Sequence, residues 1–139
     1  MSVEDILQQL NNDTDSNIIN LTTIKIQDIK NNMLQKLQLP RDDLKSLHKK
    51  LKDYRYCTDL SDLQSGNYIR WVSLKNPDKL RLTNGAFLVD IKIYADGVQL
   101  MCKNNFGSVF QFKFDEAMIF QKLNPQESVI LSVLDYLDK

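Results

Sequence analysis

The residues with the greatest capacity for chemistry in this sequence are one histidine, His48, and two cysteines, Cys57 and Cys102. An imidazole beside a thiol can activate the sulfur as a nucleophile, and both residue types are common ligands of zinc. His48, however, falls in a lysine-rich helical segment and Cys57 at its end, with no third group to orient the imidazole. The cysteines also lack the paired spacing of a tetrahedral zinc site. We therefore expect neither a nucleophile pair nor a metal centre.

Carboxylates occur in three close pairs, which are Asp42 with Asp43, Asp59 with Asp62, and Asp115 with Glu116. Glycosidases and nucleases need such groups to converge in a cleft. The sequence favours a helix start, a polar linker and a hairpin turn instead, and it contains no Gly-x-Gly-x-x-Gly motif, phosphate-binding loop or Gly-x-Ser-x-Gly elbow. These observations predict a protein that is not an enzyme and has no cofactor or small-molecule substrate. An enzyme of another class is the third hypothesis.

The segment GNYIRWVSL, residues 66–74, has the period-two pattern of a β-strand. This alternation places Ile69 and Trp71 on a face that we expect to be buried, and Tyr68 and Arg70 on the other. Aromatic and basic side chains together on a sheet surface can stack against bases or hold a peptide. The candidate ligand face comprises Tyr68, Arg70, Arg81 and Lys92, with Lys113 added where strand register permits.

The same face also has a structural interpretation, in which Tyr68 packs beneath the carboxy-terminal helix and Arg70 pairs with an acid such as Asp90. The charge balance favours this interpretation, because 18 basic and 18 acidic residues give a net charge of +0. Proteins that bind nucleic acid usually carry a basic excess. Nucleic-acid binding is therefore the second hypothesis, with an expected dissociation constant of about 10⁻⁴ to 10⁻⁶ M.

The composition, with 42% hydrophobic and 26% charged residues, is typical of a globular protein. Two cysteines and the absence of a charged-then-apolar leader indicate an intracellular location, in the cytoplasm or nucleus. No apolar run approaches the roughly 18 residues of a membrane span, so we expect no membrane association.

Residues 1–59 are expected to form a helical amino-terminal segment. Ser2 and Asp5 are typical of a capping box before a short helix, and the polar run at residues 11–17 ends it. From Thr23 onward, one face of a second helix carries Ile26, Ile29, Met33 and Leu37. Pro40 begins a third helix, whose apolar stripe comprises Leu44, Leu47, Leu51 and Tyr54.

Residues 60–139 have the periodicity of a small sheet, with strands expected at 67–74, 80–83, 86–94, 98–103, 108–114 and 117–121. Asp96-Gly97 predicts a type I′ hairpin, and Asn124, Pro125 and Glu127 predict the start of a carboxy-terminal helix. A sheet of about five or six short strands hides its edges best by closing into a barrel. The predicted fold class is α+β, with amino-terminal helices, an antiparallel meander closed as a small barrel, and a carboxy-terminal helix.

Three stretches resemble the small SH3-like and Tudor-like barrels of short proteins from large DNA viruses: LQSGNYIRWV (63–72), LTNGAFLVD (82–90) and VFQFKFDEAMIFQK (109–122). The similar features are a Gly-x-x-Ile-Arg-aromatic strand, an Asn-Gly turn before an apolar strand, and a Phe-rich closing hairpin. The resemblance implies an SH3-like barrel that acts as an interaction module. It also implies a viral structural or accessory protein, for which the virion is a further location.

The leading hypothesis is a non-enzymatic interaction or assembly protein that binds a protein partner or forms a homo-oligomer. One small sheet offers too little surface to cover every amphipathic helix, so one apolar stripe is left for another chain. We assign self-association or partner docking to Ile26, Ile29, Met33 and Leu37, and expect residues 38–139 to fold without them.

Overall fold

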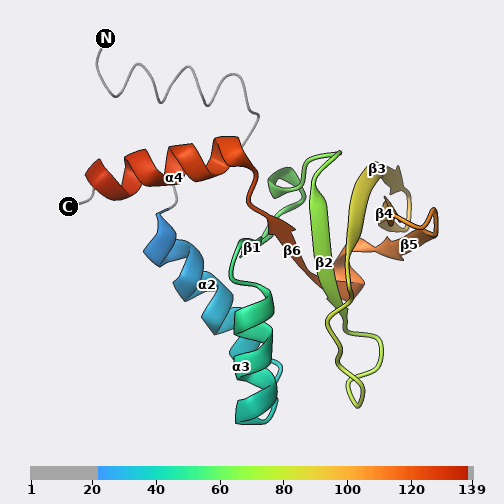
Figure 1. Cartoon of the computed structure of the whole chain (residues 1–139). Helices are drawn as coiled ribbons and strands as arrows, with labels where there is room; N and C mark the ends of the chain where they lie inside the picture. Colours follow the sequence, from blue (N-terminus) through green and yellow to red (C-terminus); the bar gives the residue numbers. More distant parts are fainter. Residues whose placement is uncertain (1–21, 138–139) are drawn as a thin grey trace.

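The computed structural model describes residues 22–137 (Figure 1). Within them, the helices are α2 (Thr23–Gln35), α3 (Arg41–Lys50) and α4 (Pro125–Leu137), and the 3₁₀ turns are η2 (Leu60–Asp62) and η3 (Phe114–Glu116). The strands are β1 (Tyr54–Tyr56), β2 (Tyr68–Ser73), β3 (Ala86–Tyr94), β4 (Gly97–Lys103), β5 (Val109–Lys113) and β6 (Ala117–Lys122). The short helix and polar run predicted for residues 2–17 lie outside the described residues.

These strands form one antiparallel sheet in the order β1-β6-β2-β3-β4-β5. Strands β2 to β5 are successive neighbours, and β6 returns to lie between β2 and β1. Figure 1 shows the helices gathered on the side of β1 and β6, with β3, β4 and β5 extending away from them. The predicted α+β class, with an antiparallel sheet and a carboxy-terminal helix, is confirmed.

Three local predictions need correction. Residues 80–83 form no strand, since only Leu82 pairs, through an isolated bridge to β2. Tyr54 begins β1 rather than continuing a helical stripe, because α3 has ended and β1 pairs with β6. The predicted hairpin joins β3 to β4, but the positive φ falls at Gly97 (+141°) and not at Asp96. Its turn is therefore not of type I′, which needs positive φ at both central residues.

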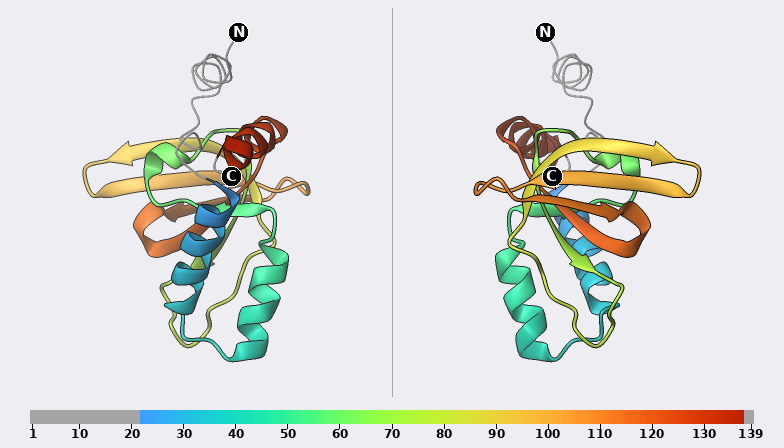
Figure 2. Two further views of the ribbon diagram at one scale, coloured as in Figure 1. Left: turned by 90° about the vertical axis from the view of Figure 1, so that its left-hand side faces the viewer. Right: turned by 90° about the vertical axis from the view of Figure 1, so that its right-hand side faces the viewer.

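Trp71 of β2 lies within the larger of two cores on the sheet, here called the inner core. Its side chain is 7% exposed, and its ring stacks on Phe112 of β5 with the centroids 4.5 Å apart. In a flat sheet β2 and β5 would be about 14 Å apart, at three strand spacings. The contact therefore requires the sheet to curl over on itself, as the side views show (Figure 2). The predicted burial of Ile69 and Trp71 is confirmed.

The opposite face of β2 and β6 carries a second core, here called the helix-side core. Its buried members are Leu34, Leu37, Leu47, Leu51, Tyr54, Val72, Met118 and Phe120. The buried Lys30 of α2 donates from Nζ to the carbonyl oxygens of Leu51 (2.8 Å) and Tyr54 (2.9 Å). The last carbonyls of a helix lack helical partners, so this amine satisfies groups just beyond α3. α2 and α3 are thus joined to each other and to the sheet.

α4 starts with the predicted capping box. Asn124 Oδ1 accepts from the backbone N–H of Glu127 (2.7 Å), and Glu127 Oε1 accepts from that of Asn124 (3.3 Å). The Glu127 side chain is fully buried and also accepts from Arg55 Nε of β1 (3.1 Å). Ile130 of α4 packs against Ile26 of α2. A buried ion pair and an apolar contact therefore fix α4 to the rest of the chain.

The stripe assigned to association lies partly inside this chain. Ile26 packs against α4 and is only 4% exposed. Leu37 belongs to the helix-side core and is only 9% exposed. Ile29 and Met33 are half-buried. Ile26 and Leu37 therefore have almost no surface to offer a second chain. Because Leu34 of α2 is also fully buried and β1 is part of the sheet, residues 22–59 and residues 60–137 share one core, and the expected independence of residues 38–139 is no longer supported.

Candidate functional site

Tyr68 and Arg70 of the candidate ligand face hold the connection between β2 and β3. Tyr68 Oη donates to the carbonyl oxygen of Asn84, and Arg70 Nε donates to that of Thr83, each at 2.8 Å. The Tyr68 ring packs on the helix-side core rather than beneath α4, and Arg70 bonds a carbonyl rather than Asp90. The structural interpretation of these two residues is therefore closer to the observed geometry than the ligand-face interpretation, but with different partners.

Arg81 and Lys92 do not join that pair. Arg81 is exposed in the connection before β3, and Lys92 lies about 16 Å along β3 from the residue that pairs with Tyr68. Strand register instead places Lys92 opposite Gln99, which is itself opposite Lys113. The four residues do not form one surface, and the register groups Lys92 with Lys113 on the outer face of β3, β4 and β5.

The histidine and the cysteines have no arrangement suited to nucleophilic catalysis. Cys57 and Cys102 are buried free thiols in the inner core, and burial raises the pKa of each to about 12. Such thiols are almost entirely protonated at neutral pH and react slowly. The pKa of His48 is lowered, mainly because the side chain is partly buried on α3 and secondly because of the charge of Lys30. Among residues 22–137, no group of His, Cys, Asp and Glu side chains is placed to hold a metal ion.

The three carboxylate pairs belong to three different elements. Asp59 and Asp62 form the capping box of η2. Asp42 and Asp43 lie in the first turn of α3, where the helix dipole favours negative charge. The third pair lies in η3, where Glu116 Oε2 forms a surface ion pair with Lys75 at 3.1 Å. Each pair thus has a local position that accounts for its acids.

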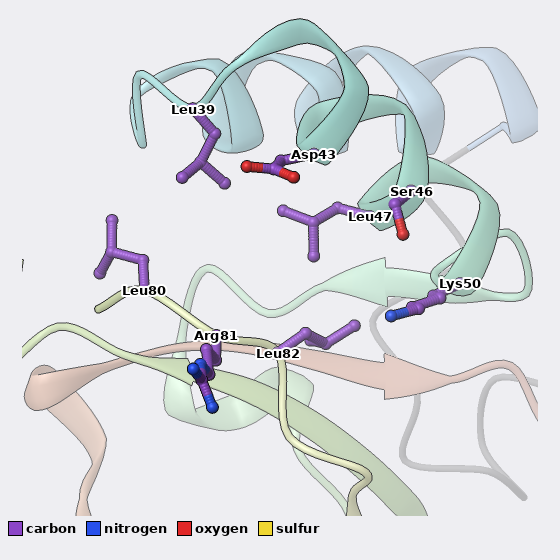
Figure 3. Close-up of a pocket in the computed structure, with 8 residues that line it drawn as sticks. All are labelled: Leu39, Asp43, Ser46, Leu47, Lys50, Leu80, Arg81 and Leu82. Atoms are coloured by element: carbon purple, nitrogen blue, oxygen red, sulfur yellow. The ribbon is translucent and has the colours of Figure 1, made fainter. Parts of the chain in front are cut away.

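A groove with a different character separates α3 from the segment that precedes β3 (Figure 3). Its apolar lining comprises Leu39, Leu47, Leu80 and Leu82, and its polar lining comprises Asp43, Ser46, Lys50 and Arg81. Figure 3 shows the α3 residues along one wall and residues 80–82 along the other, with Leu47 and Leu82 facing each other across the gap. We call this site the leucine groove.

The size of the leucine groove limits what it can bind. Its volume of about 260 Å³ is smaller than the 300–1,000 Å³ typical of small-molecule sites. Asp43 and Lys50 are separated by about 10 Å along α3, at 1.5 Å per residue. Within the described residues, neither these two side chains nor Arg81 has an ion-pair partner. The groove therefore offers an apolar floor for one or two side chains, with charges of both signs at its walls.

A second cavity, of about 400 Å³, lies beside His48 but differs in its lining. Its residues are Gln27, Asp28, Lys30, Asn31, His48 and Lys52. The Lys30 amine in this cavity is already bonded to the carbonyl oxygens that follow α3. This cavity has no apolar floor, and its buried amine has a structural role.

No protein-family model, curated protein or solved structure matches this chain. In the part of the chain that the structure describes, no helix has both the length and the apolar character needed to cross a bilayer. The functional conclusion therefore depends on the geometry of the chain itself.

Sequence periodicity did not identify the leucine groove. The pattern predicts a strand at residues 80–83, which include Leu80 and Leu82, and Leu39 falls in the short connection between two helices. A weak signal was present, because Leu80 and Leu82 are apolar residues within a mostly polar connection that contains Pro77 and Asp78. Their convergence on α3 depends on the path of the connection, which periodicity does not specify.

Proposed function

We propose that this protein is a non-enzymatic interaction module whose leucine groove binds a short amphipathic helix of a partner protein. The observation that carries the proposal is a leucine floor between α3 and residues 80–82, flanked by side chains with no ion-pair partner among the described residues. Helix-in-groove binding uses apolar anchors spaced along one helix face. The groove volume of about 260 Å³ is below the range typical of small-molecule sites, so it suits one or two anchor side chains better than a substrate molecule.

An SH3-like barrel is the proposed scaffold. Support comes from the meander of β2 to β5, from the 3₁₀ turn η3 just before β6, and from the return of β6 to the side of β2. The contact between Trp71 and Phe112 further supports this scaffold, because it requires a curved sheet and such a barrel is built from one. The viral origin implied by the sequence resemblance belongs to the same proposal.

The charged side chains that line the groove indicate which charges a bound helix would carry. Asp43 and Lys50 mark two ends of the α3 wall, and Arg81 lies on the facing wall. The bound helix would carry two apolar anchors one or two turns apart, with a basic residue near Asp43 and an acid near Arg81. Such charges add orientation and specificity, whereas the apolar anchors supply most of the affinity.

The direct test is selection of binders from a library of random peptides displayed on phage, with the full chain as bait. Ser46→Trp fills the groove from an exposed position, and Lys45→Trp is the matched control on the same helix, outside the groove lining. Peptides with paired apolar anchors should bind the wild type and the control, and lose about tenfold or more in affinity with Ser46→Trp, equivalent to 1.4 kcal/mol. Equal binding to all three proteins would show that the groove is not the site.

Nucleic-acid binding remains the second candidate, and one observation favours it. Lys92 and Lys113 flank Gln99 across three strands on a sheet face, with Lys103 on the same face. Few phosphates can be neutralised there, so binding would be in the range of about 10⁻⁴ to 10⁻⁶ M and would weaken steeply with salt. Fluorescence anisotropy with labelled single-stranded DNA at two salt concentrations separates the candidates, since nanomolar binding at physiological salt would reverse their order.

A further inference from the structure

β5 is an edge strand of the sheet, and its only strand neighbour among the described residues is β4. The opposite edge, β1, lies against α2, where Lys30 Nζ donates to the carbonyl oxygen of Tyr54 (2.9 Å). Figure 1 shows the helices of the described chain gathered on the side of β1 and away from β5. An edge strand without cover offers its backbone N–H and C=O groups to a further strand.

The hydrogen bonds of the β4–β5 hairpin show which backbone groups of β5 point outward. Asn104 donates its backbone N–H to the carbonyl oxygen of Ser108 (3.0 Å), so these residues form a hydrogen-bonded pair. Such pairs alternate along an antiparallel ladder with pairs whose backbone groups point away from each other. By this alternation, the N–H and C=O groups of Val109 and Gln111 point away from β4. Both residues are exposed, and these groups have no backbone partner within residues 22–137.

The inner face beside this edge is aromatic. Phe110 is 40% exposed and Phe112 is half-buried, and both rings contact Trp71 of β2, with centroid distances of 5.9 and 4.5 Å. A small cavity of about 90 Å³ lies beside Phe112, and its apolar lining also includes Trp71 and Ala117. A strand added to β5 places alternate side chains about 5 Å from Phe110 and Phe112. Aliphatic side chains at those positions would bury apolar surface.

The outer face beside this edge is basic. Strand register places Lys103 and Lys113 on the outer face of β4 and β5, and Lys92 and Asp90 on that of β3. Lys113 forms an exposed ion pair with Asp96 at 3.9 Å, and such pairs contribute little energy. Within the described residues, Lys103 has no ion-pair partner. Acidic side chains of an added strand would therefore meet complementary charge.

We propose that the β5 edge binds, in antiparallel orientation, an extended segment of a partner protein in which aliphatic and acidic side chains alternate. In strand addition, backbone hydrogen bonds supply affinity and the alternate side chains supply specificity. A second copy fits this edge less well, because antiparallel pairing would bring its own Lys103 and Lys113 to the same outer face and add like charges. The edge is separate from the leucine groove, so the inference goes beyond the proposed function.

The test is fluorescence anisotropy of the full chain with a labelled peptide of about seven alternating valine and glutamate residues. Gln111→Pro removes an outward N–H and leaves the bonds to β4 in place, as proline on an edge strand can. Gln111→Ala keeps that N–H and is the matched control, since both changes remove the bond between the Gln111 and Gln99 side chains. Affinity should fall by about tenfold or more in Gln111→Pro and by less than about twofold in Gln111→Ala.

Changes in the peptide test the same contact with an unaltered protein. Residues of the peptide that bond to Val109 and Gln111 lie opposite them, so their side chains share the outer face and are the glutamates. N-methylation of the glutamate amides should therefore weaken binding to the wild type by about tenfold or more, whereas N-methylation of the valine amides should weaken it much less. Replacing the glutamates by lysine should also weaken binding, because the outer face is basic.

Four results would overturn the proposal. Absence of peptide binding at about 1 mM, or equal binding by the wild type and Gln111→Pro, would show that the edge is not the site. Tighter binding of the lysine peptide would contradict the assigned charges. Tighter binding of labelled single-stranded DNA than of the glutamate peptide would assign this face to nucleic acid. A dimer mass by light scattering that Gln111→Pro converts to a monomer would assign the edge to a second copy. The leucine groove is tested separately with Ser46→Trp, so failure here leaves the proposed function unaffected.

Discussion

The sheet has two halves that bury their strands in different ways. In the helix-covered half (β1, β6 and β2), residues 118–121 of β6 are all buried, because Phe120 faces the helix-side core and Ile119 faces the inner core. In the hairpin half (β3, β4 and β5), residues 109–111 of β5 are exposed. The difference shows that the helices are part of the core of the first half, whereas the second half depends on its inner face alone.

The largest expected effect comes from removing α2. A chain that begins at Gln38 lacks Leu34, which is fully buried, and Lys30, whose amine bonds the carbonyl oxygens beyond α3. Exposure of the helix-side core should unfold the protein, because a domain of this size is only marginally stable. Far-ultraviolet circular dichroism and a thermal scan measure this. A truncated chain with a cooperative transition near that of the full chain would mean that α2 is only an appendage.

Trp71→Ala should cost about 3 to 5 kcal/mol, because a large buried ring is replaced by a cavity. The ring links the two halves through its contacts with Phe110 and Phe112 of β5. Phe106→Ala in the hairpin half is the matched control, since that ring is 94% exposed and its loss should change stability by less than about 0.5 kcal/mol. Urea unfolding followed by circular dichroism measures both. Similar losses for the two variants would contradict the assigned cores.

Arg55→Met tests the attachment of α4 to the helix-covered half. The change leaves the buried Glu127 carboxylate without its cation, which should cost about 3 kcal/mol or more. Lys75→Met breaks the exposed pair with Glu116 and should cost at most about 1 kcal/mol. Chemical denaturation at neutral pH compares them. If both variants lose equally little, the ion pair is not a determinant of stability.

Alkaline pH should lower the free energy of unfolding by a smaller amount, and this loss originates in the inner core. Burial raises the pKa of Cys57 and Cys102 from 9.0 to about 12, so the folded state favours the protonated thiols. Their contribution is complete below about pH 9 and is lost as the pH rises toward 12. The urea midpoint should be lower at pH 10 than at pH 7. The difference between the two midpoints should be smaller in Cys57→Ala. A flat profile between these values would indicate that the thiols are accessible to solvent.

The sequence was most informative where one local pattern determines one element. Asn124 and Glu127 predicted the start of α4, and the alternation of Ile69 and Trp71 predicted the inner face of β2. The pattern failed for β1, whose three residues are too few to show a period. It also could not show that Arg70 bonds Thr83, because that contact depends on the path of a connection and not on periodicity. The leucine groove was missed for the same reason.

The most direct test of the leucine groove is a charge exchange between the protein and a selected peptide. Arg81→Glu reverses a charge in the groove wall, and Lys79→Glu makes the same change nearby, outside the lining. With isothermal titration calorimetry, Arg81→Glu should weaken binding of an acidic peptide by about threefold to tenfold, and Lys79→Glu should have little effect. Replacing the acid of the peptide by lysine should restore binding to Arg81→Glu alone. Equal losses for both protein variants, with no recovery by the exchanged peptide, would contradict binding in the groove.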